Sequence, residues 1–130
     1  MPFYRLLTLL AVCAITLTGC GTKATTLNVD MKEFTFSPDH FSVPAGAQVT
    51  MNLKDSGALE HEFVIMLREK TTTLPFNEDD EANIYWEHEL MPGESAKLEF
   101  TAPSVPGDYE VVCGTAGHLE QGMRATLTVK

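Results

Sequence analysis

The feature that most constrains the fold is a series of short segments in which apolar and polar residues alternate. A period of two places every second side chain on one face of a β-strand. Pro, Gly, Asp and Ser residues that form turns separate these segments. We expect strands near residues 25–31, 34–36, 41–43, 49–53, 63–67, 96–100, 109–113 and 125–129. This pattern predicts an all-β fold, a Greek-key β-sandwich of about seven to eight strands.

One stretch, residues 70–89, departs from the pattern because it is acidic and does not alternate. Asn77 is a suitable N-cap residue, so we expect a short helix from Glu78 to about His88. Apolar side chains of this stretch would touch the sandwich, namely Ile84 and either Tyr85 or Trp86. An insertion of this length is often functional. It is either a solvated flap beside the sheet or a surface that docks a partner.

The start of the chain has a different character, with an apolar run from Leu6 to Leu17 that follows the single charge of Arg5. The run is shorter than the about 20 apolar residues that cross a bilayer, and it indicates a secretory signal. Leu17-Thr18-Gly19-Cys20 resembles the lipobox of bacterial lipoproteins, in which the cysteine carries lipid and begins the mature chain. We therefore expect a lipoprotein signal peptide at 1–19, a lipidated Cys20 with a tether at 20–26, and one domain at 27–130. An ordinary signal peptide cut nearby is the alternative.

The charge restricts the partners. The sequence has 9 basic and 18 acidic residues and a formal charge of −9. Nucleic acid is not expected as a partner, because phosphate binding needs a basic face. The charge suits a domain outside the cytoplasm, or one that docks on a basic partner.

Cysteine usage indicates a thiol that must be protected. Cys13 leaves with the signal peptide and Cys20 would carry lipid, so Cys113 has no disulfide partner in an oxidising compartment. A lone thiol there is oxidised unless it is buried or bound to a metal. His118 and Met123 follow Cys113 at successive intervals of five residues, between two expected strands. Thiolate, imidazole and thioether are soft ligands that suit copper.

A trigonal copper site needs a second histidine, because it uses two histidines, one cysteine and a long axial methionine. His40, His61 and His88 remain in the chain. His61 is the best placed, since it lies at the start of an apolar strand, at an end of the sandwich that can lie beside the Cys113 loop. Zinc also binds thiolate and imidazole, but a structural zinc site uses four strong ligands and a thioether is a weak one.

Three segments resemble the cupredoxins, the family of small blue-copper proteins. They are LEHEFVI at 59–65, MPGESAKLEFTAPSVPGDYEVVC at 91–113 and CGTAGHLEQGM at 113–123. The long ligand loop is similar to that of the auracyanins. The resemblance implies one copper ion, Cu+ or Cu2+, with a set of four ligands: His61, Cys113 and His118 in the trigonal plane and Met123 on the axis.

This chain departs from the family pattern at two positions beside the ligands. Glu62 stands where an asparagine often follows the first histidine, and Gly114 stands where a serine or threonine commonly follows the cysteine. Groups around a ligand tune its metal, so these two positions bear on the reduction potential.

The resemblance implies an electron carrier and not an enzyme. The expected protein is a monomer, lipid-anchored to a bacterial membrane and facing the periplasm or the cell exterior. Redox protein partners would dock near His118, on a patch of apolar residues: Ala58, Leu59, Ala116 and Leu119. One alternative is a periplasmic copper-binding protein for copper tolerance or delivery. Another is a non-redox module whose metal site is a relic.

Overall fold

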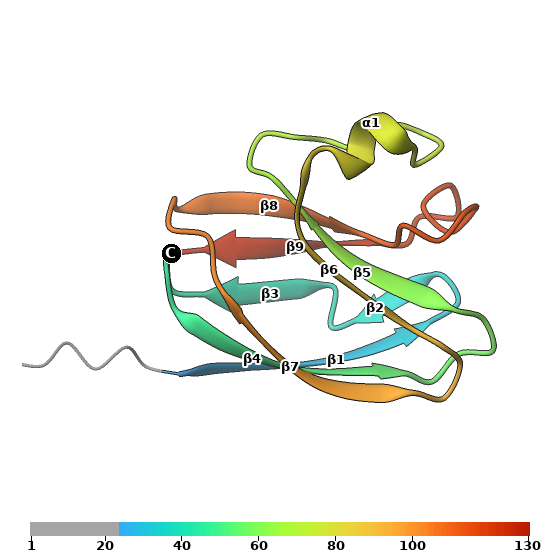
Figure 1. Ribbon diagram of the computed structural model, residues 1–130, viewed down its shortest axis with the longest axis horizontal. Helices are drawn as coiled ribbons and strands as arrows, with labels where there is room; N and C mark the ends of the chain where they lie inside the picture. Colours follow the sequence, from blue (N-terminus) through green and yellow to red (C-terminus); the bar gives the residue numbers. More distant parts are fainter. Residues whose placement is uncertain (1–23) are drawn as a thin grey trace, which may run out of the picture.

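The computed structural model describes residues 24–130, which form two β-sheets packed face to face (Figure 1). The predictions for the signal peptide and for Cys20 lie outside the described residues. The elements are β1 (Thr25–Lys32), β2 (Thr35–Ser37), β3 (His40–Val43), β4 (Gln48–Asp55), β5 (His61–Met66), α1 (Glu78–Glu81), β6 (Ile84–Leu90), β7 (Ser95–Thr101), β8 (Gly107–Val112) and β9 (Arg124–Val129). The predicted all-β sandwich is confirmed, with more strands than expected.

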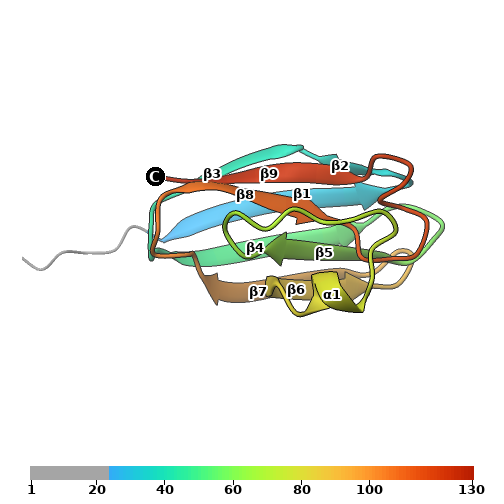
Figure 2. The same cartoon turned by 90° about the horizontal axis from the view of Figure 1, so that it is seen from above.

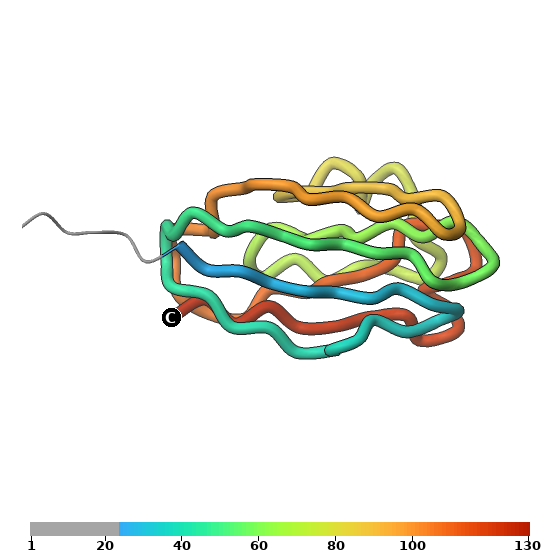
Figure 3. The backbone as a smooth tube through the Cα atoms, turned by 90° about the horizontal axis from the view of Figure 1, so that it is seen from below, coloured from blue at the N-terminus to red at the C-terminus, as the bar shows by residue number. Residues whose placement is uncertain are grey.

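The strand order brings distant segments together. One sheet has the order β2-β1-β4-β7, which Figure 3 shows from below, and the other has the order β3-β9-β8-β5-β6, which Figure 2 shows from above. β1 pairs in parallel with β4, and β3 in parallel with β9. β5 lies antiparallel to β8, so the start of β5 and the end of β8 meet at one end of the sandwich.

The core follows the alternation seen in the sequence. Along β4, Val49, Met51 and Leu53 are buried while the residues between them are partly or fully exposed. Aromatic rings join the two sheets, since Phe63 of β5 packs edge-on against Phe36 at 5.3 Å between ring centroids. Such pairs add stability beyond the area that they bury.

β5 is buried on both faces along its apolar run from Phe63 to Met66. Its inward side chains Phe63 and Ile65 join the core between the sheets. Its outward side chains Val64 and Met66 form a second apolar cluster with Val112 and Leu119. Phe76 of the segment before α1 packs against this cluster. The acidic insertion therefore covers the outer face of β5 at this point.

The expected helix from Glu78 to about His88 is wrong in its length. It begins as predicted, because Asn77 caps it and forms a capping box with Asp80, but it ends at Glu81. The next residues form β6, which pairs antiparallel with β5. Trp86 of β6 stacks on Phe100 at 4.9 Å, with its ring against the core. No helix among residues 24–130 has the length and apolar character needed to span a membrane.

Candidate metal centre

One end of the sandwich gathers the four candidate ligands from two segments. His61 begins β5, Cys113 directly follows β8, His118 lies in the β8–β9 loop and Met123 directly precedes β9. The exposed fractions are 0% for His61, Cys113 and Met123 and 5% for His118. In Figure 1 the β8–β9 loop lies at the end of the sandwich opposite the C-terminus.

The β8–β9 loop is folded back on itself by backbone hydrogen bonds. The Cys113 N–H donates to the Met123 carbonyl at 3.1 Å, and the Met123 N–H donates to the His118 carbonyl at 3.1 Å. Within this loop Cys113 Sγ lies 3.4 Å from His118 Nδ1. With the bond lengths known for zinc, about 2.3 Å to sulfur and 2.0 Å to nitrogen, two ligands of one ion lie roughly 3.5 Å apart in tetrahedral geometry and about 3.7 Å apart in trigonal geometry. The loop thus holds Cys113 and His118 at the spacing of two ligands of one ion.

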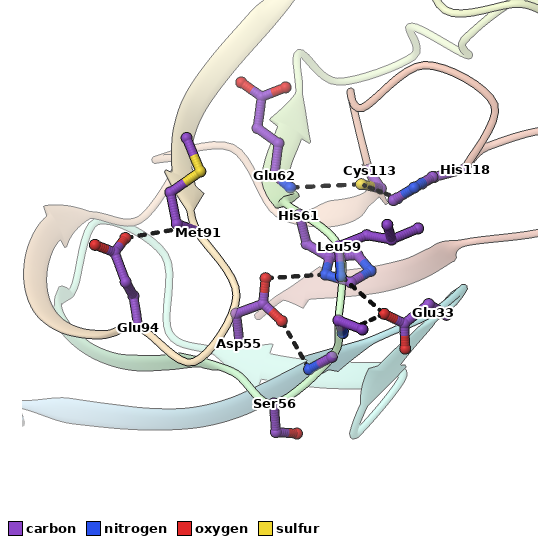
Figure 4. Close-up of polar contacts among 12 residues, drawn as sticks. Glu33, Asp55, Ser56, Leu59, His61, Glu62, Met91, Glu94, Cys113 and His118 are labelled. Carbon is purple, nitrogen blue, oxygen red and sulfur yellow. Dashed lines mark hydrogen bonds and ion pairs between the residues drawn. The ribbon is translucent and has the colours of Figure 1, made fainter.

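The Cys113 sulfur has a defined environment. The Glu62 N–H donates to Sγ at 3.4 Å, across from the neighbouring strand (Figure 4). Burial raises the pKa of the Cys113 thiol above its ordinary value. Within residues 24–130 this thiol is free and buried. A bound cation would stabilise the thiolate form of Cys113 and so offset the cost of burying its charge.

His61 sits beside this pair with one nitrogen engaged and the other free. Its Nδ1 lies 3.0 Å from Asp55 Oδ2, and both side chains are fully buried. The centroid of its ring lies 4.9 Å from that of His118. Its Nε2 is buried without a hydrogen-bond partner. A buried polar atom without a partner costs about 1–3 kcal/mol, so it indicates a missing binding partner.

The donor atoms of the four residues are of the kinds that bind a soft metal ion, but their side chains are not all arranged around one point. Among residues 24–130, no group of three or more His, Cys, Asp or Glu side chains is arranged to hold a metal ion. The candidate set, however, contains one thioether beside a thiol and two imidazoles, and this combination suits copper. The unpartnered Nε2 of His61 and the close pair of Cys113 and His118 both lie at this end of the sandwich.

The loop before His61 is fixed by two carboxylates that were not identified from the sequence. Asp55 Oδ1 accepts the Gly57 N–H at 2.8 Å, and Glu33 Oε1 accepts the N–H groups of Ala58 and Leu59, the latter at 3.0 Å. Backbone hydrogen bonds, from its own N–H and then from Ala58, lower the pKa of Glu33. Asp55 could have been identified from the sequence, because it occupies an inward position in the alternation of β4, where an apolar residue is expected.

The two departures from the family pattern contact each other. A Cβ built on Gly114 would overlap Glu62 Oε2, so the absence of a side chain at Gly114 makes room for this carboxyl. Burial, followed by the repulsion of Glu87 and Glu89, raises the pKa of Glu62 to about 7. Glu62, Gly114 and Glu87 line a cavity of about 490 Å³ together with Glu81 of α1.

The surface over His118 differs from the expected apolar patch. Leu119 is only 1% exposed and packs in the second apolar cluster, so its assignment to the patch is wrong. Phe34, in the β1–β2 turn, packs edge-on against His118 at 5.2 Å between ring centroids. Leu59 and Met91 are each 47% exposed. The turn at Phe34 and the loop at Leu59 thus supply apolar surface at this end.

The two remaining histidines have other contacts. His40 is exposed on β3, and its Nε2 lies 3.2 Å from Thr128 Oγ1. His88 is half-buried on β6 and stacks on Trp86 at 6.4 Å.

Comparisons with known proteins agree with this architecture. Residues 5–129 match the family model of the cupredoxin-like domain. No curated protein matches the chain. Among solved structures, the reduced auracyanin of the photosynthetic bacterium Roseiflexus castenholzii is 28% identical, with a TM-score of 0.68 over 82% of this chain and 97% of that chain.

More distant structures show the fold alone. Auracyanin A of Chloroflexus aurantiacus, described as a "blue" copper protein, is 24% identical, with a TM-score of 0.66 over 82% of this chain and 99% of that chain. The multicopper oxidase mgLAC is 15% identical, with a TM-score of 0.59 over 82% of this chain and 39% of that chain. Because the family model spans nearly the whole sequence, the chain belongs to the cupredoxin-like domain family.

Proposed function

We propose that this protein is a blue-copper electron carrier that holds one copper ion, Cu+ or Cu2+. His61, Cys113, His118 and Met123 would hold this ion. The observation that carries the proposal is the 3.4 Å spacing of Cys113 Sγ and His118 Nδ1 inside a cupredoxin-like domain. The similarity to reduced auracyanin, and the description of auracyanin A as a blue copper protein, support copper as the metal.

Bound copper would supply a one-electron couple, and the chain would supply a rigid, dry site for it. The β8–β9 loop is tied by its own backbone hydrogen bonds, and the loop before His61 is tied by Asp55 and Glu33. Burial of the candidate ligands excludes water from the site. The Glu62 N–H would stabilise negative charge on the Cys113 sulfur. Ligands held in this way move little when the charge of the metal changes.

The proposal is a carrier and not an enzyme. The multicopper oxidase neighbour is more than twice as long as this chain, because the match covers only 39% of it. An oxidase needs additional copper sites, and the histidines outside the candidate site, His40 and His88, lie on different strands with other contacts. Redox protein partners would dock near His118, where Phe34 and Leu59 supply apolar surface that needs little desolvation.

Reversible electrochemistry tests the carrier function. The copper-loaded protein should give a reversible one-electron voltammogram and keep its copper in the presence of a moderate chelator. Met123→Leu should keep the copper and shift the potential, because a weak thioether ligand would tune the couple. His88→Ala is the matched control and should leave the potential unchanged. An irreversible couple in the native chain would contradict a carrier.

The second candidate is a copper-binding protein for tolerance or delivery, in which copper is cargo. The observation that favours it is the acidic cavity beside Cys113, lined by Glu62, Glu81 and Glu87, since clustered negative charge attracts cations. Rapid surrender of copper to the chelator, without a reversible couple, is the outcome expected of a cargo protein.

The location is part of the proposal. A signal peptide at 1–19 and a lipidated Cys20 would anchor the protein to a bacterial membrane, facing the periplasm or the cell exterior. The first strand begins at Thr25, which pairs with Val49 near the start of β4. The Ala45 N–H, just before β4, donates to the Lys130 carbonyl. Thr25 and Lys130 therefore lie at the same end of the sandwich. An anchor there would leave the Cys113 end free for a partner.

Fractionation of cells tests the anchor. Cys20→Ala should move the protein from the membrane to the soluble fraction, because the lipid would be lost. Cys113→Ser is the control and should stay in the membrane fraction. Retention of Cys20→Ala in the membrane would contradict lipidation.

A further inference from the structure

A cleft lies near the end of the sandwich opposite the candidate metal centre. It has a volume of about 480 Å³ and lies between residues 67–70, which follow β5, and the β7–β8 loop. A Cβ built on Gly107, the first residue of β8, would lie 2.9 Å from Arg68 Nε, so the Arg68 side chain crosses the start of β8. The candidate ligand Cys113 follows the other end of the same strand (Figure 1).

The cleft is lined mainly by apolar groups that solvent reaches. The exposed fractions are 39% for Leu67, 36% for Tyr85 and 48% for Val105. Two tyrosine rings at the cleft are held in place, because the Tyr85 hydroxyl donates to the Thr101 carbonyl and the Tyr109 hydroxyl donates to the Val105 carbonyl, both at 2.8 Å. Their hydroxyls are therefore engaged, and the cleft offers apolar surface to a binding partner.

Basic side chains border this apolar surface in a chain that is otherwise acidic. The whole sequence has 9 basic and 18 acidic residues, but Arg68 and Lys70 line the cleft with a single acidic residue, Glu69. Glu69 Oε1 lies 3.3 Å from Arg68 Nη2, and its side chain is 78% exposed. An exposed ion pair of this kind is weak, so another anion can replace the Glu69 carboxylate. The charge around the cleft suits an anionic partner.

The described chain begins at the same end as this cleft. Gly107 pairs with Val129, next to Lys130, and Lys130 and Thr25 share one end of the sandwich. A chain extends by at most about 3.6 Å per residue, so a lipid on Cys20 would keep Thr25 within about 18 Å of the membrane surface. The cleft would then lie close to the lipid headgroups.

We propose that the cleft is a docking surface for anionic phospholipids. Arg68 and Lys70 meet the lipid phosphates, and Leu67 and Val105 lie at the boundary with the acyl chains. Basic and apolar side chains that act together in this way are typical of binding at a membrane interface. The membrane as partner rests on the anchor in the proposed function, whereas the chemistry of the cleft does not. Docking there turns the Cys113 end away from the membrane.

A short-chain lipid tests the cleft without any membrane. Dihexanoyl phosphatidylglycerol, kept below its micelle concentration, is added to the ¹⁵N-labelled full chain carrying Cys20→Ala, so the outcome does not depend on lipidation. The backbone signals of residues 67–70 and 104–105 should shift, and inorganic phosphate at the same concentration should leave them in place. Equal shifts with phosphate, or no shifts with the lipid, would overturn the proposal.

The anchored full chain tests the orientation in vesicles of equal parts phosphatidylcholine and phosphatidylglycerol. A fluorophore is attached at Ser104→Cys in the β7–β8 loop or at Ser95→Cys at the opposite end of β7, since Cys113 is buried and does not react. A lipid with a nitroxide on its headgroup should quench the fluorophore at position 104 and not at position 95. Equal quenching at both positions would overturn the proposal.

Substitutions separate the charge at the cleft from the charge of the whole chain. Arg68→Gln with Lys70→Gln should lower the ratio of docked to undocked domains about 25-fold, roughly fivefold for each basic side chain lost beside an anionic surface. Lys54→Gln with Lys97→Gln removes the same charge from exposed positions on β4 and β7, and it should leave the quenching unchanged. Equal effects of the two pairs would overturn the role of the cleft. A native chain that does not join the vesicles would refute the lipid anchor, while the short-chain lipid still decides whether the cleft binds phospholipid.

Discussion

Two glycines beside the candidate ligands differ in what an added methyl group would meet. A Cβ on Gly57 would lie 2.8 Å from His61 Cε1 and 2.8 Å from Glu33 Oε1. The His61 ring is buried and is held by Asp55, so it has little room to move. A Cβ on Gly114 would instead meet the end of the Glu62 side chain, which is half-buried and flexible.

Gly57→Ala should therefore destabilise the fold more than Gly114→Ala. Overpacking against a fixed buried ring costs about 1–3 kcal/mol. The Glu62 carboxyl can swing away from a methyl group added at Gly114, so we expect a loss below about 1 kcal/mol there. Urea unfolding of the two metal-free variants measures both values. Equal losses, or a greater loss for Gly114→Ala, would contradict the fixed position of His61.

At the residue scale, the sequence suggested candidate ligands that lie on one loop, and it missed contacts that depend on distant pairing. Cys113, His118 and Met123 follow one another closely, so their spacing alone suggested a site, and His61 was suggested by its place at a strand end. Glu33 was missed because its role arises only when the β1–β2 turn meets the loop before His61. Asp55 interrupts an apolar alternation, and this signal could have identified it.

At the scale of elements, the acidic composition of β6 led to the wrong prediction of a helix for this strand. Its sequence IYWEHEL alternates, but the acidic residues at the exposed positions and the preceding acidic run suggested a continued helix. Residues 84–90 form a strand because they pair with β5, and this pairing packs the Trp86 side chain against the core. Tertiary burial outweighs a local preference of a few tenths of a kcal/mol per residue.

The short helix α1 depends on one buried carboxylate. Asp80 is 4% exposed and accepts the N–H of Thr73 at 3.1 Å, the Thr73 hydroxyl at 3.0 Å and the N–H of Asn77 at 3.1 Å. Asp80→Ala should cost about 1–3 kcal/mol in urea unfolding, because these donors lose their acceptor. The exposed neighbour Asp79→Ala should change stability by less than about 0.5 kcal/mol. Similar losses for the two variants would contradict this account of the insertion.

At the scale of the whole molecule, the sandwich separates the candidate site from the end where the described chain begins. The fold class was predictable because alternation and turn residues are local signals. The order of the strands was not, because the parallel pairing of β1 with β4 and of β3 with β9 joins segments far apart in the sequence. The first pairing lies within one sheet and the second within the other, and the first places the end of β1, before the β1–β2 turn, beside the end of β4 at Asp55.

The central claim is that Cys113 binds copper as a thiolate, and the visible absorption spectrum during addition of Cu(II) to the folded chain tests it most directly. The native chain should develop an intense thiolate-to-copper band that saturates at one copper ion per chain. Cys113→Ser should lack the band, and His88→Ala should keep it. A native chain without the band, or a band that survives in Cys113→Ser, would contradict the account.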